Sequence, residues 1–179
     1  MMASEDDRIE IDIEIDRDAG FVGDYLLYLL AAASDAASAD FHAHVREQGL
    51  RVPEWRILAC LCDEDGQMVT QLAQLALMEQ SHLTKIVDQM ATKGLVKRRS
   101  DERDRRRVRV YLTAAGRVLG TGLVKKAREH EMSIVSRLGA TDAARLKAAL
   151  KDIHAICRGG DDAAGRASSA PAELEASLS

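Results

Sequence analysis

Two adjacent stretches of the sequence carry the side chains best suited to binding another molecule. If residues 80–93 form a helix with its apolar positions inward, the other face is polar and suits hydrogen bonds to base edges or phosphates. That face holds Gln80, Ser81, His82, Thr84, Lys85, Asp88 and Gln89. Residues 93–109 follow with nine Lys and Arg against three Asp and Glu, a local net charge of +6. Such a patch is the electrostatic footprint of a nucleic-acid binder, although a solvated loop has the same composition.

Other chemistry finds less support in the sequence. Cys60 and Cys62 are two residues apart on an expected helix, as are His42 and His44, so each pair points to different faces. No His, Cys and Glu cluster has metal-ligand spacing. The sequence also shows no nucleophile elbow and no Gly-rich phosphate loop. We therefore expect no metal, no cofactor and no enzymatic activity.

The composition indicates a mostly α-helical globular protein. The chain has 179 residues, of which 46% are hydrophobic and 30% charged, and it contains only two prolines. No window approaches 18 apolar residues, so no membrane segment is expected. The N-terminus is acidic where a signal peptide would be basic, and three cysteines suit a reducing compartment. These features predict a cytoplasmic protein.

Apolar spacing predicts the elements that position the polar face. Leu83, Ile86, Val87 and Met90 recur at helical spacing, and a shorter helix opened by a Thr70 N-cap precedes them. Two short helices joined by a tight turn form the helix-turn-helix pattern. Residues 108–112 alternate between apolar and polar as a strand does, with 96–99 as its partner. Residues 100–106 then form the tip of a β-hairpin.

Long helices are expected on both sides of this lobe. Residues 21–48 form one helix that ends at Gly49, and their first half is apolar on nearly all sides, which favours burial by a partner subunit. Pro53 opens the next helix, Thr113 caps a helix to about residue 137, and Thr141 caps the last helix. One stripe of that last helix holds Leu146, Ala149, Leu150, Ile153, Ile156 and Cys157.

These expectations divide the chain into five segments. Residues 1–18 are an acidic, flexible leader, with eight acids against two bases from residue 5 to residue 18. Residues 53–116 form the DNA-binding lobe, and residues 21–50 and 117–158 form a helical dimerisation region. Residues 159–179 are rich in Gly, Ala and Ser and are expected to be a disordered tail.

The sequence resembles the MarR family of transcription regulators over about residues 21–158. The most specific part is GLVKRRSDERDRRRVRVYLTAAG at 94–116, with RVPEWRILACL at 51–61 and QSHLTKIVDQMATKGLV at 80–96 in support. The family's wing carries Asp-x-Arg and then Leu-Thr-x-x-Gly, which match Asp104, Arg106, Leu112, Thr113 and Gly116. The resemblance implies a winged helix-turn-helix homodimer that binds double-stranded DNA, with its first and last helices at the two-fold interface.

The resemblance also implies roles for single residues. Arg106 would enter the minor groove, and Asp104 would hold the wing in shape by pairing with a neighbouring arginine. Arg99 and Arg105, in the same basic wing, are also expected to bind DNA, as is Gln80 at the start of the helix. Ser81, His82, Thr84 and Lys85 would face the major groove, although any of these side chains could instead contact phosphate.

A possible effector site is suggested by the aromatic residues. Tyr25, Tyr28, Phe41 and Trp55 fall in the first two helices, and Arg46 or Arg51 could supply a cation. Members of the resembling family often bind small aromatic acids near these helices. This predicts an aromatic carboxylate or acyl thioester as effector, with a plain dimer core as the alternative for these residues.

Two other functions remain open at this point. The chain could be a helical protein-interaction module whose basic hairpin binds acidic partners, or a redox- or metal-responsive regulator of the same fold. The order of helix, helix and wing along the chain favours the DNA-binding regulator.

Overall fold

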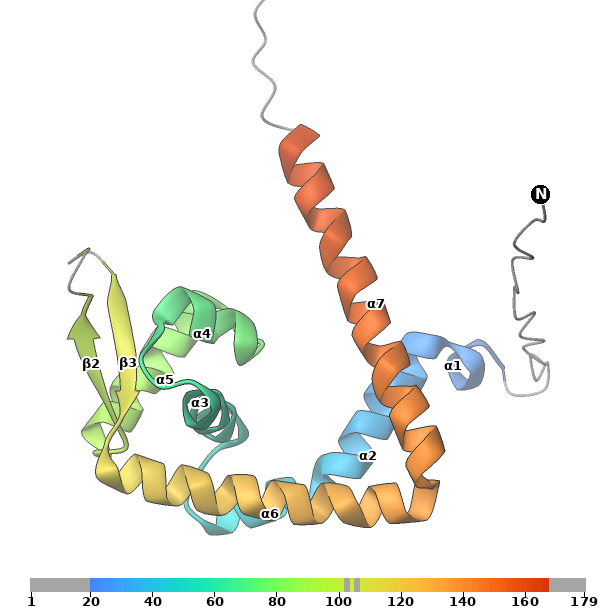
Figure 1. Cartoon of the computed structure of the whole chain (residues 1–179), viewed down its shortest axis with the longest axis horizontal. Helices are drawn as coiled ribbons and strands as arrows, with labels where there is room; N and C mark the ends of the chain where they lie inside the picture. The colour runs from blue at the N-terminus through green and yellow to red at the C-terminus, as the bar shows by residue number, and fades with distance from the viewer. Residues whose placement is uncertain (1–19, 102–103, 105–106, 168–179) are drawn as a thin grey trace, which may run out of the picture. The chain divides into compact units, whose positions relative to one another are not determined.

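The computed structural model describes residues 20–101, 104 and 107–167 (Figure 1). It is mostly α-helical with one small sheet, as predicted. In chain order the elements are α1 (Gly20–Asp24), α2 (Leu26–Glu47), α3 (Val52–Asp63), β1 (Gln67–Met68), α4 (Val69–Leu75), α5 (Gln80–Thr92), β2 (Val96–Ser100), β3 (Val108–Leu112), α6 (Ala114–Leu138) and α7 (Ala140–Ala167). The chain divides into two units, residues 1–126 and 127–179. The predicted acidic leader at 1–18 lies outside the described residues.

The helix-turn-helix is formed by α4 and α5, which pack against each other and against α3. The four apolar residues predicted for the inner face of α5 are all buried, together with Leu72 on α4 and Leu58 on α3. The prediction of Thr70 as N-cap is wrong, because α4 begins at Val69 and Met68, two residues earlier, occupies the cap without a side-chain hydrogen bond. Met68 is still extended through its strand pairing, so the helix starts directly after it.

The predicted β-hairpin is present and carries a third strand. Strands β2 and β3 pair antiparallel from Val96 opposite Leu112 to Ser100 opposite Val108. Strand β1 pairs with the other edge of β3, giving the order β1-β3-β2. Sequence reasoning missed β1, since two residues are too short to show an alternating pattern. We call the elements from α3 to β3 the winged lobe.

The predicted helix over residues 21–48 is interrupted. Tyr25 is extended, with φ −74° and ψ 113°, and separates α1 from α2. The C-terminal part of α2 contacts α3 through the buried side chains of Phe41 and Val45. Gly49 has a φ of +72°, as expected for a residue that ends a helix, and Pro53 lies in the first turn of α3.

The two C-terminal helices begin close to the predicted positions. Thr113 caps α6, because its Oγ1 accepts a hydrogen bond from the Gly116 N–H at 3.0 Å. Helix α7 begins directly after Gly139, whose φ is +95°, so the prediction of Thr141 as N-cap is wrong. Within the described parts of the chain, no helix is both long and apolar enough to span a membrane.

The predicted start of the disordered tail at residue 159 is also wrong, because α7 continues through three glycines to Ala167. The prediction of a disordered tail follows from the high content of Gly, Ala and Ser in residues 159–179. A glycine costs only about 1 kcal/mol within a helix, whereas alanine, which recurs here, is the best helix former.

Candidate nucleic-acid interface

The polar face of α5 is largely where the sequence places it. Gln80, Ser81, His82 and Lys85 are exposed, and Thr84 is half-buried. Thr84 donates its hydroxyl hydrogen to the Gln80 carbonyl oxygen at 2.9 Å. The Thr84 side chain can therefore offer a partner its methyl group or oxygen lone pairs, but not a donor.

Side chains in the C-terminal half of α5 bond to β2 and to the start of α3. Asp88, the one acidic residue on the predicted face, forms an ion pair with Arg98 of β2. Gln89 accepts a hydrogen bond from the guanidinium of Arg51, at the start of α3. The predicted face thus divides into a bonded C-terminal part and an exposed N-terminal part that remains available to a partner.

A buried carboxylate fixes the far end of α5. Glu54 on α3 is 0% exposed and accepts hydrogen bonds from Lys93 Nζ at 2.8 Å and from the Arg51 N–H at 2.7 Å. Burial by itself would raise the pKa of Glu54, but these hydrogen bonds and the two positive charges outweigh it, and the pKa lies below its usual value. The carboxylate is therefore ionised at neutral pH and holds α5 against α3.

The wing is organised around Asp101, directly after β2. Its Oδ2 pairs with Arg109 Nε at 2.5 Å, and its Oδ1 accepts from the Asp104 N–H at 3.1 Å. Its N–H donates to the Arg107 carbonyl oxygen at 2.8 Å. The hydrogen bond to Asp101 also raises the pKa of Arg109. Sequence reasoning missed this pair, because it depends on the strand register, which places Arg99, two residues before Asp101, opposite Arg109.

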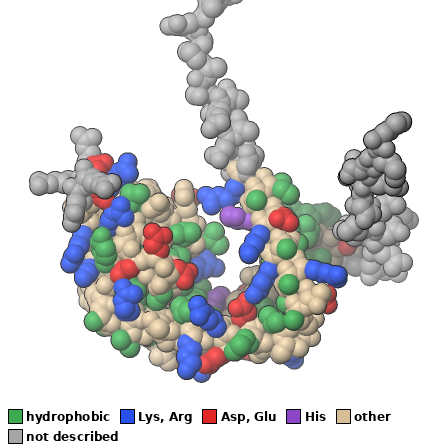
Figure 2. All heavy atoms as spheres, viewed as in Figure 1, with side chains coloured by type: hydrophobic (Ala, Val, Ile, Leu, Met, Phe, Trp, Pro, Cys, Tyr) green, Lys and Arg blue, Asp and Glu red, His purple; other side chains and the backbone are tan. Residues whose placement is uncertain are grey.

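The residues predicted at the wing tip are only partly described. Asp104 pairs with Arg107, Oδ2 to Nε at 3.2 Å, which is the kind of neighbouring arginine expected for it. Arg99 lies over the ring of Tyr111, 5.5 Å from its centroid. Arg105 and Arg106 lie outside the described residues, so their contacts with DNA stay predictions. In Figure 2, Lys and Arg side chains gather over the strand edge of the winged lobe, with Asp and Glu side chains among them.

The residues predicted for an effector site fall into two groups. Phe41 and Trp55 form an edge-to-face pair with centroids 5.0 Å apart. Tyr25 instead stacks on Phe21 at 5.0 Å, and both Tyr25 and Tyr28 are exposed. Tyr28 and Phe41 are 13 residues apart on α2, roughly 20 Å at 1.5 Å per residue. One small ligand therefore cannot contact all four aromatic residues of one chain.

Two arginines and one aspartate influence the pKa of a histidine beside the Phe41–Trp55 pair. Burial, Arg56 and Arg46 all lower the pKa of His42, the neighbour of Phe41, while Asp35 opposes them. Arg46 itself is exposed, close to the C-terminal end of α2.

The two cysteines of α3 are poor candidates for redox sensing. Burial raises the pKa of both the Cys60 and the Cys62 thiol, and Asp63 adds to the shift of Cys60. A reactive cysteine needs the thiolate form, which both shifts disfavour. Among the residues described, no group of three or more His, Cys, Asp or Glu side chains could hold a metal ion.

The region that forms this interface is similar to known proteins. The family model described as "MarR family" matches residues 50–108, which span most of the winged lobe. The MarR family transcriptional regulator SPO1453 from Silicibacter pomeroyi DSS-3 has a similar solved structure, with 57% identity and a TM-score of 0.70. That match covers 76% of this chain and 98% of the relative.

Two further solved structures were determined with bound partners. The transcriptional repressor CouR, bound to a 23-mer DNA duplex, is 25% identical with a TM-score of 0.68, over 76% of this chain and 96% of CouR. NadR in complex with 4-hydroxyphenylacetate is 27% identical with a TM-score of 0.64, over 69% of this chain and 88% of NadR.

One curated relative is a regulator by its name. The HTH-type transcriptional regulator TtmR from Methylorubrum extorquens (strain PA1) is 27% identical over 94 residues, or 52% of this chain. The match spans about half of TtmR, 48% of its length. The match to SPO1453 covers nearly all of that transcriptional regulator. The exposed polar face of α5 beside the basic wing is consistent with this match, because such a surface can bind DNA. This chain is a DNA-binding transcription regulator of the MarR family.

Proposed function

We propose that this regulator is a homodimeric repressor that binds a pseudo-palindromic operator and is released by a small aromatic acid or its thioester. The observation that supports operator binding is the exposed N-terminal half of α5 beside the basic wing. Gln80, Ser81, His82 and Lys85 face the major groove, and the wing reaches the adjacent minor groove. The solved structure of CouR bound to a 23-mer DNA duplex supports double-stranded DNA as the partner. A two-fold dimer places the half-sites about one helical turn, roughly 10 base pairs, apart.

Exposed apolar residues at both ends of the chain support the homodimer. In the single chain Phe21 is 77% exposed and Leu26 is 55% exposed, and on α7 Leu150 and Ile156 are 40% and 75% exposed. Large contiguous apolar patches are rare on monomeric proteins and mark a contact with another molecule. A second copy of the chain covers these residues in the proposed regulator.

The wing arginine provides a direct test of DNA reading. Replacing Arg106 with Ala is expected to weaken operator binding by about 1–3 kcal/mol, because it removes a groove contact from the hairpin tip. Fluorescence anisotropy titration of the DNA upstream of the regulator's own gene measures the change. Arg145→Ala serves as the control, since Arg145 is an 80% exposed arginine on α7 whose pair with Asp142 is at 3.9 Å. Equal affinities for the two variants would refute the role of Arg106.

For the effector we propose an aromatic carboxylate bound near Phe41 and Trp55. Half-buried Trp55 offers aromatic surface beside the buried Phe41, and Arg46 offers a positive charge for the carboxylate. The complex of NadR with 4-hydroxyphenylacetate supports this ligand class. A ligand changes DNA affinity only through its different affinities for two conformations, so 100-fold release of DNA requires about 2.7 kcal/mol of coupling.

A ligand screen tests this proposal. In a thermal-shift screen of benzoates, hydroxybenzoates, hydroxycinnamates and their thioesters, we expect at least one compound that stabilises the free protein. The same compound should release DNA in a titration, and operator DNA should weaken its binding by the same factor, because the coupling is reciprocal. If no compound in these classes both stabilises the protein and releases DNA, the Phe41–Trp55 pair belongs to the core alone.

A further inference from the structure

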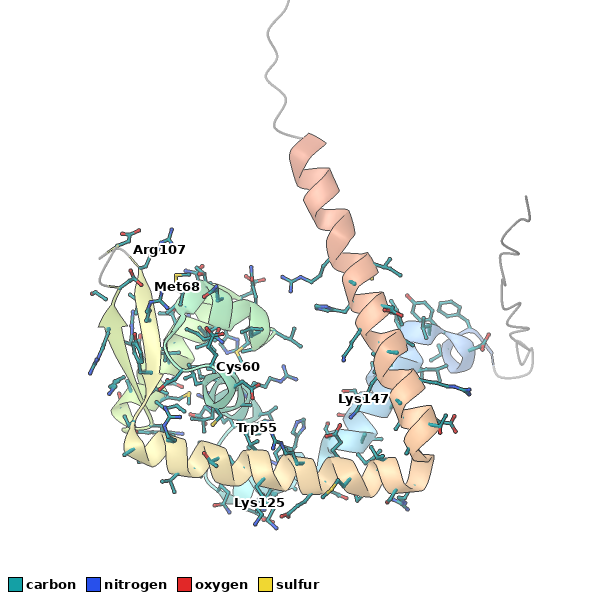
Figure 3. All side chains as sticks on the ribbon, in the orientation of Figure 1. Trp55, Cys60, Met68, Arg107, Lys125 and Lys147 are labelled. Atoms are coloured by element: carbon teal, nitrogen blue, oxygen red, sulfur yellow. The ribbon has the colours of Figure 1, made fainter. Side chains whose placement is uncertain are left out.

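A groove of about 440 Å³ lies between the wing and the N-terminal parts of α4 and α5. Two wing arginines line it, together with polar and apolar residues from the three neighbouring elements. The lining residues are Met68, Val69, Thr70, Gln80, Thr84, Arg98, Arg107 and Val108. Figure 3 labels Met68 and Arg107, which lie close together at this edge of the lobe. The groove therefore borders the exposed, DNA-facing half of α5.

The two arginines reach the groove from opposite arms of the hairpin. Arg98 lies on β2 and Arg107 directly precedes β3, with side-chain exposures of 37% and 61%. Arg98 binds Asp88 through Nη1. Arg107 binds Asp104 through Nε and contacts Met68 Sδ through Nη1 at 3.8 Å. A guanidinium has five N–H donors in a planar fork, so each arginine retains donors for a further acceptor while a carboxylate orients it.

The rest of the lining suits an anion better than a base edge. Thr70 contributes an exposed hydroxyl group and Gln80 an exposed amide. The Thr84 hydroxyl adds no donor, because its hydrogen is bonded to the Gln80 carbonyl oxygen. Two guanidinium groups with one hydroxyl form a strong donor set for the oxygens of a phosphate, which arginine binds in a bidentate manner.

We propose that this groove binds one phosphodiester of the DNA backbone, held by Arg98, Arg107 and the Thr70 hydroxyl. Asp88 and Asp104 position the two guanidinium groups. The inference rests on the proposed function, since a duplex entered by the N-terminal half of α5 brings a backbone phosphate to the groove beside it. A phosphate contact fixes the register of the protein on the duplex without reading sequence.

Arg98→Gln and Arg107→Gln test the site. Each variant is expected to weaken binding about 5- to 20-fold, by the same factor for the DNA upstream of the regulator's gene and for an unrelated duplex. The slope of log affinity against log salt should fall by about 1 for each variant. Arg145→Gln is the control, because it removes the same charge from an exposed ion pair, of the i,i+3 kind that Arg107 also forms, and should change affinity less than twofold. Circular dichroism checks that every variant is folded.

Neutral methylphosphonates locate the phosphate. Substituted one position at a time, they should weaken wild-type binding at a position that recurs in each half-site. At that position the Arg98→Gln/Arg107→Gln double variant should lose nothing further. If the double variant keeps full sensitivity at every phosphate, or the single variants bind as Arg145→Gln does, the phosphate site is refuted. Failure of the wild type to bind any duplex would instead refute the proposed function.

Discussion

The Gly116→Ala variant is expected to lose about 3 kcal/mol or more of the free energy of unfolding. A Cβ atom at this position would lie 1.9 Å from the Leu95 carbonyl oxygen and 2.9 Å from its carbonyl carbon. Leu95 cannot easily move away, because its N–H donates to Met90 and its carbonyl oxygen accepts from Thr113, at 3.0 and 3.1 Å. Overpacking against a fixed backbone costs typically 1–3 kcal/mol and sometimes more.

Gly122→Ala is the matched control on the same helix. Apart from its two chain neighbours and the nearby backbone of α6, no atom lies within 4 Å of a Cβ built at Gly122, so this variant is expected to gain about 0.5–1 kcal/mol through the higher helix propensity of alanine. Urea unfolding of both variants measures the difference. Similar stabilities for the two would show that α6 does not begin against Leu95, and would leave the Gly of the Leu-Thr-x-x-Gly motif without a structural reason.

The double variant Leu150→Asp/Ile153→Asp is expected to convert the proposed dimer into a monomer. Leu150 is 40% exposed and Ile153 is partly exposed in the single chain, and both lie on the apolar stripe predicted for α7. A second copy would bury them. An unpaired charge buried in an apolar interface costs several kcal/mol, and the two-fold axis counts each substitution twice. Sedimentation velocity measures the mass of the species in solution.

Lys151→Asp controls for the added charge. Lys151 lies between the two positions on α7, and it is exposed and outside the apolar stripe, so this variant should remain dimeric. If the Leu150→Asp/Ile153→Asp variant sediments as a folded dimer, the homodimer interface lies elsewhere. Dissociation of both variants would mean that charge near α7, rather than burial of the stripe, determines assembly.

The elements best predicted from sequence are those with a repeated apolar pattern. Leu83, Ile86, Val87 and Met90 fixed the inner face of α5, and the alternation of 108–112 fixed β3. Elements with a short or local cause were not predictable in the same way. Strand β1 exists because Gln67 and Met68 pair with β3, and the first residue of α4 depends on that pairing. The break at Tyr25 likewise has no signal in the apolar spacing.

The candidate site shows the same division between local and long-range causes. The helical period predicted which α5 residues face outward, but not that Asp88 would be paired by an arginine ten residues later. The ion pair of Asp101 with Arg109 likewise depends on the residues that the strand register brings together. Their positions in the first two expected helices place Tyr28 and Phe41 in one aromatic group, whereas in the structure the length of α2 separates them. Contacts between residues far apart in the sequence become apparent only in the fold, whereas the direction that nearby residues face follows from their spacing.

The affinity of the protein for DNA tests the central claim most directly. Fluorescence anisotropy would compare the duplex upstream of the regulator's own gene with a scrambled duplex of the same composition, at two salt concentrations. The account predicts that the upstream duplex binds at least about 1,000-fold more tightly, and that affinity for both duplexes falls steeply as salt rises. Equal affinity for the two duplexes, or no binding of either at low salt, would contradict a regulator that reads DNA through α5 and the wing.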